Sequence, residues 1–303
     1  MPAPASSPAD GGGARRAIVT GATGLVGIFL LPRLVAAGWE VEALSRRAAP
    51  ARLPAGVRWH VRDVAQGLGT ARGTLAVHAA PLWLLPPLLP ALAAAGVVRL
   101  LAFGSTSRFS KQDATSAAAR ALAGALARAE DAVAAGASAQ GMEWTLLRPT
   151  LVHGAGRDRN VSAMARFIRR WRVFPLAGEG RGLRQPVHAD DLARACLQAL
   201  DAPATAGRAY DLPGGSTLPY REMAERLYAA LGRRPRFVRV PLALLRGGLT
   251  AAAWLPRLGH LSPDMADRMD HDQAFDAGPA RADFGYDPRP FDAAGVVGDI
   301  GGA

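Results

Sequence analysis

The sequence contains few cysteines, lysines and tyrosines. Cys196 is the only cysteine, which excludes an internal disulfide, suits a reducing compartment and leads us to expect a cytoplasmic protein. No cysteine-rich or histidine-rich spacing is present, so we expect no metal site. Lys111 is the only lysine, and the first of the four tyrosines is Tyr210. In the first two thirds of the chain, no tyrosine and only one lysine are therefore available for catalysis.

Long uninterrupted apolar runs are also missing. The longest apolar stretch, residues 81–103, contains four prolines, a glycine and an arginine, which a membrane-spanning helix tolerates poorly. We expect a buried helix followed by a buried strand there. Residues 240–255 are interrupted by Arg246 and favour a core helix over a membrane-surface helix. Residues 1–14 have no apolar segment and predict a disordered tail, not a signal peptide.

The excess of basic residues has no nucleic-acid pattern. The formal net charge is +11, yet the arginines are scattered, as in Arg46-Arg47 and Arg169-Arg170. A nucleic-acid groove needs clustered charge and a recognisable module. We therefore expect solvated surface arginines, no nucleic-acid partner, and at most a weak attraction for anionic substrates.

Short apolar runs alternate with helix-length segments, which predicts βαβ units and a mostly parallel sheet. With half of the residues hydrophobic, the chain can form a large core. We expect an α/β fold with a Rossmann-type, doubly wound sheet in residues 15–150, completed by roughly 184–213. Residues 151–183 and 214–303 are expected to form a smaller substrate lobe. The predicted strands are 16–20, 40–45, 57–60, 75–78, 100–104, 144–147, 185–188 and 209–212, and the predicted helices include 24–38, 116–135, 160–170, 190–200 and 220–231.

A glycine-rich turn joins the first predicted strand to the first predicted helix. It reads Thr20-Gly21-Ala22-Thr23-Gly24-Leu25-Val26-Gly27. This spacing in a strand–turn–helix context is typical of a dinucleotide pyrophosphate site. Gly21 permits the tight turn, Gly24 lets the phosphates approach, and Gly27 lets the helix pack closely. The amides at the helix start, with Thr23, Leu25 and Val26, are expected to face the phosphates.

The end of the second predicted strand indicates which dinucleotide binds. NAD-binding proteins usually carry a carboxylate there for the ribose hydroxyls. This chain instead has Ser45 followed by Arg46 and Arg47. A hydroxyl and an arginine suit a 2′-phosphate, so the pattern favours NADP, with NAD as the alternative. The two arginines also fit plain surface charges.

Further motifs resemble the short-chain dehydrogenase/reductase superfamily, in its extended or atypical branch of epimerase/dehydratase type. They are Arg62-Asp63-Val64, Val77-His78-Ala79-Ala80, Leu147-Arg148-Pro149-Thr150 and Val187-His188-Ala189-Asp190-Asp191-Leu192-Ala193. The resemblance spans roughly residues 15–290. It implies that Asp63, Val64, Ala79, Ala80 and Pro149 line the cofactor. The residues also allow plainer readings: a turn at Asp63, core histidines at His78 and His188, and a helix cap at Asp190 or Asp191.

The resemblance also implies a Tyr-x-x-x-Lys pair on the helix at 116–135, which this chain lacks. Aligned on Glu130, the pair falls on Leu122 and Leu126. The remaining catalytic candidate is Ser105, which follows the fifth predicted strand and equally suits a strand-end cap. A proton for hydride chemistry would then come from Ser105, His153 or water. Ser107 and Lys111 have the spacing of the pair without its tyrosine or its helix.

Two arginines stand where relatives bind substrates. The resemblance implies substrate contacts at Arg157 and Arg184, which would suit a pyrophosphate or a carboxylate, although surface ion pairs are equally expected there. The substrate would be a small molecule, such as a sugar nucleotide. The Ala-rich helix at 116–135 would permit close packing in a homodimer.

Two classes of function follow. The first is an NADP-dependent oxidoreductase or a sugar-nucleotide-modifying enzyme, which the polar groups at Ser105, Arg157 and Arg184 favour. The second is a non-catalytic cofactor-binding protein that acts through protein contacts, as in proteins that resemble the NmrA regulators or the nucleotide-binding accessory subunit of respiratory complex I. The missing pair favours this second class.

Overall fold

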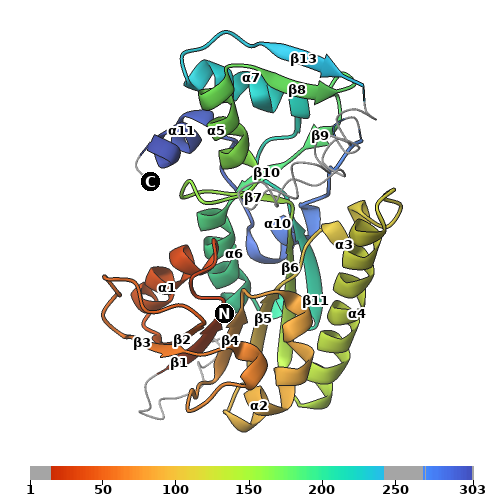
Figure 1. Ribbon diagram of the computed structural model, residues 1–303. Helices are drawn as coiled ribbons and strands as arrows, with labels where there is room; N and C mark the ends of the chain where they lie inside the picture. Colours follow the sequence, from red (N-terminus) through yellow and green to blue (C-terminus); the bar gives the residue numbers. More distant parts are fainter. Residues whose placement is uncertain (1–14, 242–268, 270, 302–303) are drawn as a thin grey trace, which may run out of the picture.

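Seven parallel strands form the main sheet of the computed structural model, which describes residues 15–241, 269 and 271–301 (Figure 1). Their order across the sheet is β11-β6-β5-β4-β1-β2-β3. Sequence alternation of short apolar runs and helices therefore produced the expected doubly wound α/β fold. The strands are β1 (Arg16–Thr20), β2 (Glu40–Ser45), β3 (Val57–Val61), β4 (Leu75–His78), β5 (Arg99–Phe103), β6 (Glu143–Pro149) and β11 (Arg208–Leu212).

The strand order reverses at β1, which pairs with β2 on one side and with β4 on the other. The chain runs outward from β1 to β3 and then returns to β4. The carboxyl ends of β1 and β4 therefore form the switch point of the sheet, which is where ligands bind in open α/β sheets.

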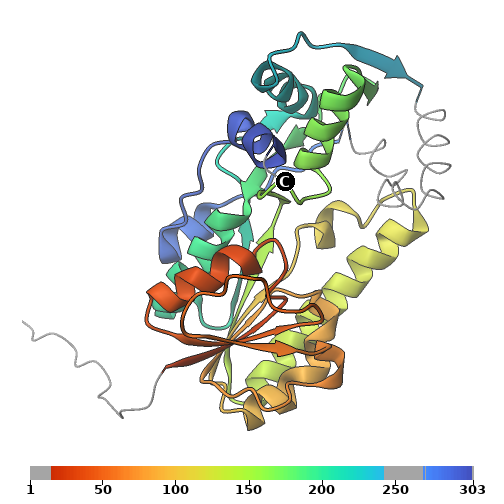
Figure 2. The same ribbon diagram turned by 60° about the vertical axis from the view of Figure 1, so that its left-hand side comes forward.

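Helices cover both faces of this sheet (Figure 2). The helices α1 (Gly27–Ala36), α6 (Ala189–Asp201) and α10 (Gly278–Phe284) share one apolar core with the strands. The helices α2 (Leu89–Ala94) and α4 (Ala117–Ala139) share the other. Alternate strand residues face the two layers, so Val19 belongs to the first core and Ile18 to the second.

A third apolar core lies beyond the carboxyl edge of the sheet and defines what we call the second lobe (Figure 1). It is joined to the main sheet through two-stranded pairings of β7 (Leu151–His153) with β10 (Pro186–His188) and of β9 (Leu183–Arg184) with β12 (Leu218–Pro219). The elements of the second lobe are α5 (Val161–Trp171), β8 (Phe174–Ala177), α7 (Tyr220–Ala230), β13 (Phe237–Val240) and α11 (Ala293–Gly301).

In the apolar stretch 81–103, the predicted buried strand is confirmed, whereas the helix predicted before it is divided. The stretch forms two 3-10 turns, Leu82–Leu84 and Pro86–Leu88, then the short α2 and β5. The prolines lack an amide hydrogen and restrict the backbone, so they divide the segment. The predicted tail at 1–14 and most of the predicted helix at 240–255 lie outside the described residues. Within the described ranges, no helix combines the length and apolarity needed to cross a bilayer.

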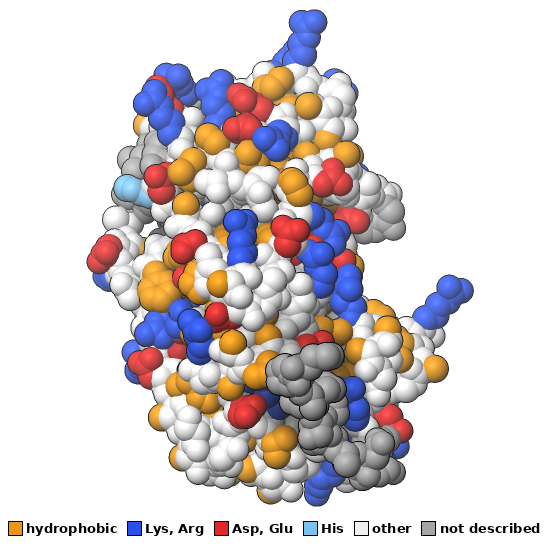
Figure 3. All heavy atoms as spheres, turned by 180° about the vertical axis from the view of Figure 1, so that it is seen from behind, with side chains coloured by type: hydrophobic (Ala, Val, Ile, Leu, Met, Phe, Trp, Pro, Cys, Tyr) orange, Lys and Arg blue, Asp and Glu red, His pale blue; other side chains and the backbone are white. Residues whose placement is uncertain are grey.

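The surface charges are dispersed. On the face shown in Figure 3, Lys and Arg side chains are spread over the surface with Asp and Glu between them. Several arginines are paired, among them Arg16 with Glu40 at 3.0 Å and Arg226 with Glu222 at 2.7 Å. This face therefore carries no continuous basic stripe of the kind that follows a nucleic-acid backbone.

Candidate functional site

The glycine-rich turn packs directly against the loop that leaves β4. Gly21 has φ +73°, and a Cβ there would lie 2.5 Å from the carbonyl carbon of Ala79 and 2.6 Å from the amide nitrogen of Ala80. A Cβ on Gly24 or Gly27 would lie 2.9 or 2.5 Å from the Gly21 carbonyl oxygen. Only glycine allows these approaches. The turn and the β4 loop therefore sit side by side at the point where the strand order reverses.

The amino end of α1 presents unoccupied hydrogen-bond donors. The helix has no side-chain cap and no acidic residue in its first turn. Within the described part of the chain, the amides of Leu25 and Val26 have no acceptor. Uncapped amides and the positive end of the helix dipole suit a pyrophosphate. This geometry fits the diphosphate of NAD or NADP.

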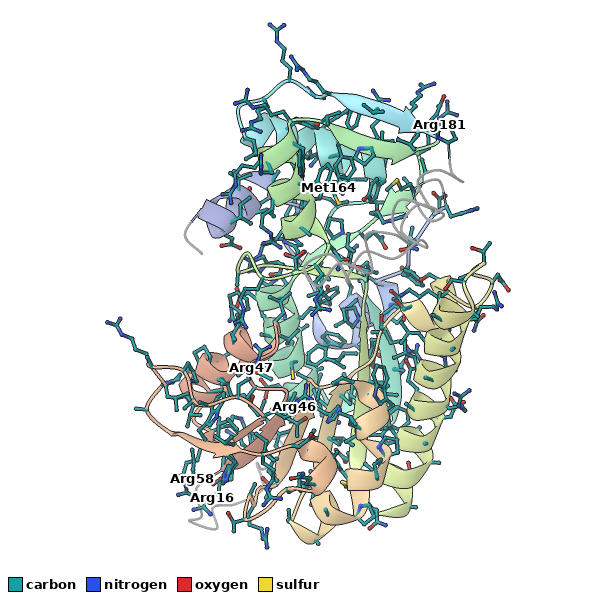
Figure 4. All side chains as sticks on the ribbon, in the orientation of Figure 1. Arg16, Arg46, Arg47, Arg58, Met164 and Arg181 are labelled. Atoms are coloured by element: carbon teal, nitrogen blue, oxygen red, sulfur yellow. The ribbon has the colours of Figure 1, made fainter. Side chains whose placement is uncertain are left out.

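At the end of β2, the Ser45 side chain turns toward the glycine-rich turn. Its Oγ lies 3.0 Å from Thr23 Oγ1 and accepts a hydrogen bond from the Arg47 amide at 3.1 Å. Ser45 is buried, whereas Arg46 and Arg47 are exposed. Figure 4 places both arginines near α1. Ser45 is thus brought to the glycine-rich turn, and the role of Ser45 and Arg46 in ribose recognition stays a prediction.

The other predicted cofactor residues have structural roles of their own. Asp63 accepts the Ala65 amide at 3.0 Å and caps a 3-10 turn, as the plainer reading expected. Val64 is buried, and Ala79 and Ala80 contact the glycine-rich turn. The Pro149 carbonyl accepts hydrogen bonds from both the amide and the hydroxyl of Thr106. Whether they also contact a cofactor stays a prediction.

A cavity of about 290 Å³ lies between the carboxyl ends of β5 and β6 and the second lobe. Such a volume is at the lower end of ligand sites, which span about 300–1,000 Å³. Its lining is mostly polar, so it suits a small substrate with hydrogen-bonding groups. The lining includes Ser105, Thr106, Ser107, Ser110, Lys111, Thr150, Asn160, Arg184, Gln185, Tyr220 and Gln273.

Ser105 lines this cavity with its hydroxyl in a defined arrangement. The Oγ accepts a hydrogen bond from the Ser107 amide at 3.1 Å. The serine therefore caps the turn after β5, as the plainer reading expected, and its own O–H can still donate into the cavity. Both predicted roles of Ser105 are compatible with this geometry.

The two predicted substrate arginines are separated. Arg184 lines the cavity but is only 4% exposed, and its Nη1 donates to the Leu183 and His271 carbonyls. Arg157 does not line this cavity. Its Nη2 instead donates to the Thr23 carbonyl at 3.4 Å. The guanidinium of Arg157 thus lies at the glycine-rich turn, because the loop after β7 passes over the start of α1.

Several cavity residues carried no signal in the sequence. Tyr220 begins α7 and lines the cavity, with the Arg184 guanidinium 5.6 Å from its ring centre. Gln185 is held by the Phe275 backbone and by Thr217. Lys111 and Ser107 also line the cavity, although the spacing alone gave them little weight. Tyr220 lines the cavity only because α7 returns to this edge of the sheet, and Gln185 is held there by residue Phe275.

The positions aligned with the missing pair are apolar, as the sequence indicated. Leu122 is half-buried on α4, and Leu126 is 5% exposed in the core. Neither lines the cavity. One turn further, Glu130 is 1% exposed and accepts hydrogen bonds from Arg108 and Arg148 at 2.6 and 2.8 Å. The helix therefore supplies a buried ion cluster and no acid–base group.

Two histidines, His78 and His153, belong to the interior. His78 lies between Thr20 and the Pro81 carbonyl, and burial lowers its pKa to about 4. His153 is 4% exposed and does not line the cavity; burial, and then His188, lower its pKa to about 4. The prediction that His153 could supply a proton to the substrate is wrong, because the side chain packs away from the cavity. The core reading of His78 is confirmed.

The aspartates at the start of α6 do not cap it. His188 is the cap, because its Nδ1 accepts the Asp190 amide at 3.1 Å. Asp190 pairs with Arg33 and Arg289, and the buried Asp191 also pairs with Arg289. The capping prediction is wrong, since both carboxylates are engaged by arginines from α1 and the C-terminal segment. Across the described residues, no group of His, Cys, Asp and Glu side chains is arranged to hold a metal ion.

Residues 86–212 match the model of the NAD dependent epimerase/dehydratase family. The resemblance to this family is confirmed. The chain is 31% identical over 105 residues to an Arabidopsis thaliana protein, NADH dehydrogenase [ubiquinone] 1 alpha subcomplex subunit 9, covering 34% of the chain and 26% of the relative. It is 32% identical over 153 residues to the 2-alkyl-3-oxoalkanoate reductase of Stenotrophomonas maltophilia, covering 47% and 46%.

The likeness in fold extends over nearly the whole chain. It aligns with the UDP-glucose 4-epimerase of Thermus thermophilus, solved with NAD, at a TM-score of 0.68 and 21% identity, covering 94% of the chain and 98% of the epimerase. The matches to the curated relatives, in contrast, span less than half of those proteins. The comparison with this solved structure thus shows that the fold is shared.

Proposed function

We propose that this chain is an NAD(P)-dependent oxidoreductase of the epimerase/dehydratase type that acts on a small polar substrate. The observation that carries the proposal is the cavity beside Ser105, lined by hydroxyl, amide and basic side chains at the carboxyl edge of the sheet. The glycine-rich turn lies two strands away on the same edge.

The cofactor would supply a hydride donor or acceptor. The residues of the chain would bind and orient the substrate. With its lone pair engaged by the Ser107 amide, Ser105 Oγ can donate its proton to a carbonyl oxygen. Lys111 adds a positive charge to the same cavity, which favours an oxygen that gains negative charge.

For the substrate, we propose a small carbonyl or hydroxyl compound in preference to a sugar nucleotide. The volume of about 290 Å³ supports the smaller ligand. One relative is named as a reductase of 2-alkyl-3-oxoalkanoates, and a keto group suits donation from Ser105. Epimerisation of a sugar nucleotide needs a base for a hydroxyl proton, and the cavity lacks the tyrosine–lysine pair.

For the cofactor, we propose NADP. The end of β2 offers Ser45, Arg46 and Arg47 and no carboxylate. Guanidinium groups and a hydroxyl pair well with a phosphate monoester.

The first experiment is a calorimetric titration of the protein with NADPH and, separately, with NADH. We expect tighter binding of NADPH. A screen of small ketones with NADPH then follows the loss of absorbance at 340 nm, with the Ser105→Ala variant as the comparison. We expect Ser105→Ala to lower kcat by about 10²-fold or more without weakening NADPH binding. An unchanged kcat would remove Ser105 from the mechanism, and binding of neither dinucleotide would contradict the function.

A second candidate is a cofactor-binding protein without catalysis. Leu122 and Leu126 at the positions of the acid–base pair favour it, and one relative is named as a subunit of NADH dehydrogenase. Tight NADPH binding without turnover of any ketone or alcohol tested would support this candidate over the first.

A further inference from the structure

A second cavity, of about 410 Å³, lies between α1 and the segment that follows β2. We call it the arginine cavity. Its floor is apolar, with Ile28 and Leu31 of α1 and the Trp59 ring of β3. Three arginines, Arg47, Arg52 and Arg157, also line it, among Thr23 and small or apolar residues. None of its lining residues belongs to the cavity beside Ser105.

The three arginines come from two different parts of the chain. Arg47 and Arg52 follow β2, whereas Arg157 lies in the loop between β7 and α5, which leads into the second lobe. Its Nη2 donates to the Thr23 carbonyl at 3.4 Å. Arg157 therefore forms the wall of the arginine cavity that lies next to the glycine-rich turn.

The loop that carries Arg157 is held in one shape. The neighbouring Asp158 is buried and accepts the amides of Asn160 and Ser162, each at 3.0 Å. Gly156 has φ +61°, and a Cβ there would lie 2.6 Å from the Asp299 carbonyl oxygen. Arg166 also donates to the Gly156 carbonyl. These contacts fix the backbone of the loop and therefore the position from which the Arg157 side chain extends.

No described residue places a carboxylate against the guanidinium groups of the arginine cavity. Within the described ranges, no carboxylate lies within 4.0 Å of Arg47, Arg52 or Arg157. Nearby arginines differ, since Arg33 on α1 is paired with Asp190 and Arg58 on β3 with Glu42. Three unpaired guanidinium groups around one hollow attract an anion, above all a dianion that accepts several charge-assisted hydrogen bonds.

Thr23 lines the arginine cavity, and its Oγ1 lies 3.0 Å from Ser45 Oγ at the end of β2. On a turn of this kind, the cofactor ribose lies at the end of the second strand. We propose that the arginine cavity receives the ribose 2′-phosphate and that Arg157, supplied from the second-lobe side, selects NADP over NAD. The inference rests on the proposed NADP-binding function and adds a residue that no strand-end pattern indicates.

A link between cofactor and substrate sites follows. Asn160 and Met164, which line the cavity beside Ser105, lie directly after the Arg157 loop. Figure 4 shows Met164 in the second lobe. A 2′-phosphate bound to Arg157 would thus hold the segment that bounds the substrate cavity, and NADP would order that wall while NAD would not.

The test compares Arg157→Ala with Arg159→Ala in the full chain. Arg159 is exposed on the same loop and does not line the arginine cavity, so its loss changes the net charge equally. Dissociation constants are measured for NADPH, NADH, adenosine 2′,5′-bisphosphate and 5′-AMP at one fixed salt concentration, because phosphate binding depends on salt. Circular dichroism and thermal unfolding check that each variant is folded.

We expect Arg157→Ala to weaken NADPH and the bisphosphate at least about tenfold, with NADH and 5′-AMP changed less than about twofold, and Arg159→Ala to change none of them. Unchanged NADPH binding in Arg157→Ala would overturn the inference while leaving the proposed function intact. Equal losses for NADPH and NADH would also overturn it, since Arg157 would then support the turn only. A wild-type protein that prefers NADH, or that binds neither dinucleotide, would overturn the NADP proposal and this inference with it.

Discussion

Gly24 lies at the centre of the glycine-rich turn, where a Cβ would already be 2.9 Å from the Gly21 carbonyl oxygen. Beyond it lie the free amides of Leu25 and Val26. A side chain at this position would therefore occupy the space that the diphosphate needs, and a negative side chain would also repel it.

We predict that Gly24→Asp lowers the affinity for NADPH by more than about 100-fold, through steric conflict and charge repulsion. Isothermal titration measures the change. Gly298→Asp is the control, because Gly298 lies on α11 and a Cβ added there would meet no atom within 4 Å. Undiminished binding in Gly24→Asp would contradict the placement of the cofactor.

His153 is a residue whose burial links stability to pH. Its ring packs edge-on against His188 and Phe291, with centroids 5.2 and 5.6 Å away. Within the described chain, Nδ1 has no hydrogen-bond partner. The charged groups around it include Asp158, Arg289 and Asp292. Because burial lowers the pKa from 6.5 to about 4, the folded protein holds this ring neutral where the unfolded chain would protonate it.

The free energy of unfolding should therefore fall as the pH drops from 6.5 to 4. We predict that His153→Phe, which preserves the aromatic packing, makes this decline shallower by up to about 1.4 kcal/mol per pH unit. The buried His78 also makes the free energy of unfolding depend on pH, and this effect is the same in the wild type and in His153→Phe. Urea unfolding at several pH values measures the difference, and parallel curves for variant and wild type would contradict the prediction.

At the scale of elements, one buried ion cluster ties four of them together. Glu130 of α4 bonds to Arg108 of α3 (Ser107–Ser110) and to Arg148 of β6. Arg148 lies 3.6 Å from Asp211 of β11. The short helix α3 carries Ser107 and leads to Lys111, so the cluster also positions one wall of the substrate cavity.

We predict that Glu130→Gln destabilises the protein by about 3 kcal/mol, because two arginines lose the anion that they share in the interior. Glu222→Gln breaks an exposed pair with Arg226 and should cost below about 1 kcal/mol. Denaturant midpoints of the two variants give the comparison. Equal midpoints would mean that the cluster contributes no more than a surface ion pair.

At the scale of the whole molecule, the long helix α4 leaves a row of small side chains uncovered. Ala117, Ala118 and Ala121 are exposed, while Ala119 and Ala123 face the core. Helices with small side chains can approach closely, and two-fold dimers are the commonest assemblies of soluble proteins.

We predict that the protein is a homodimer in solution through this face of α4. Light scattering should give twice the chain mass, and Ala121→Arg should shift the mass toward the monomer while NADPH binding is kept. A monomer mass for the unmodified protein would exclude the interface.

The sequence alone determined the main sheet and the glycine-rich turn. Strands such as Arg16–Thr20, Glu40–Ser45 and Leu75–His78 were predicted with their observed bounds, because each is a short apolar run ended by turn residues. The glycine-rich turn needs only residues close in sequence, since its spacing places the helix start beside the strand end. The sequence alone also showed that the tyrosine–lysine pair is absent, because the only lysine is Lys111 and the first tyrosine is Tyr210.

Only the tertiary structure decided which distant side chains meet. Arg157 reaches Thr23 across 134 positions of sequence, and Tyr220 reaches the cavity because α7 packs in the second lobe. His153 is buried in the core, although the sequence left it open as a proton donor. Asp190 pairs with arginines from two other segments, although the sequence favoured a helix cap there. Local sequence sets what a residue can do, whereas the packing of elements far apart in the chain decides which partner it finds.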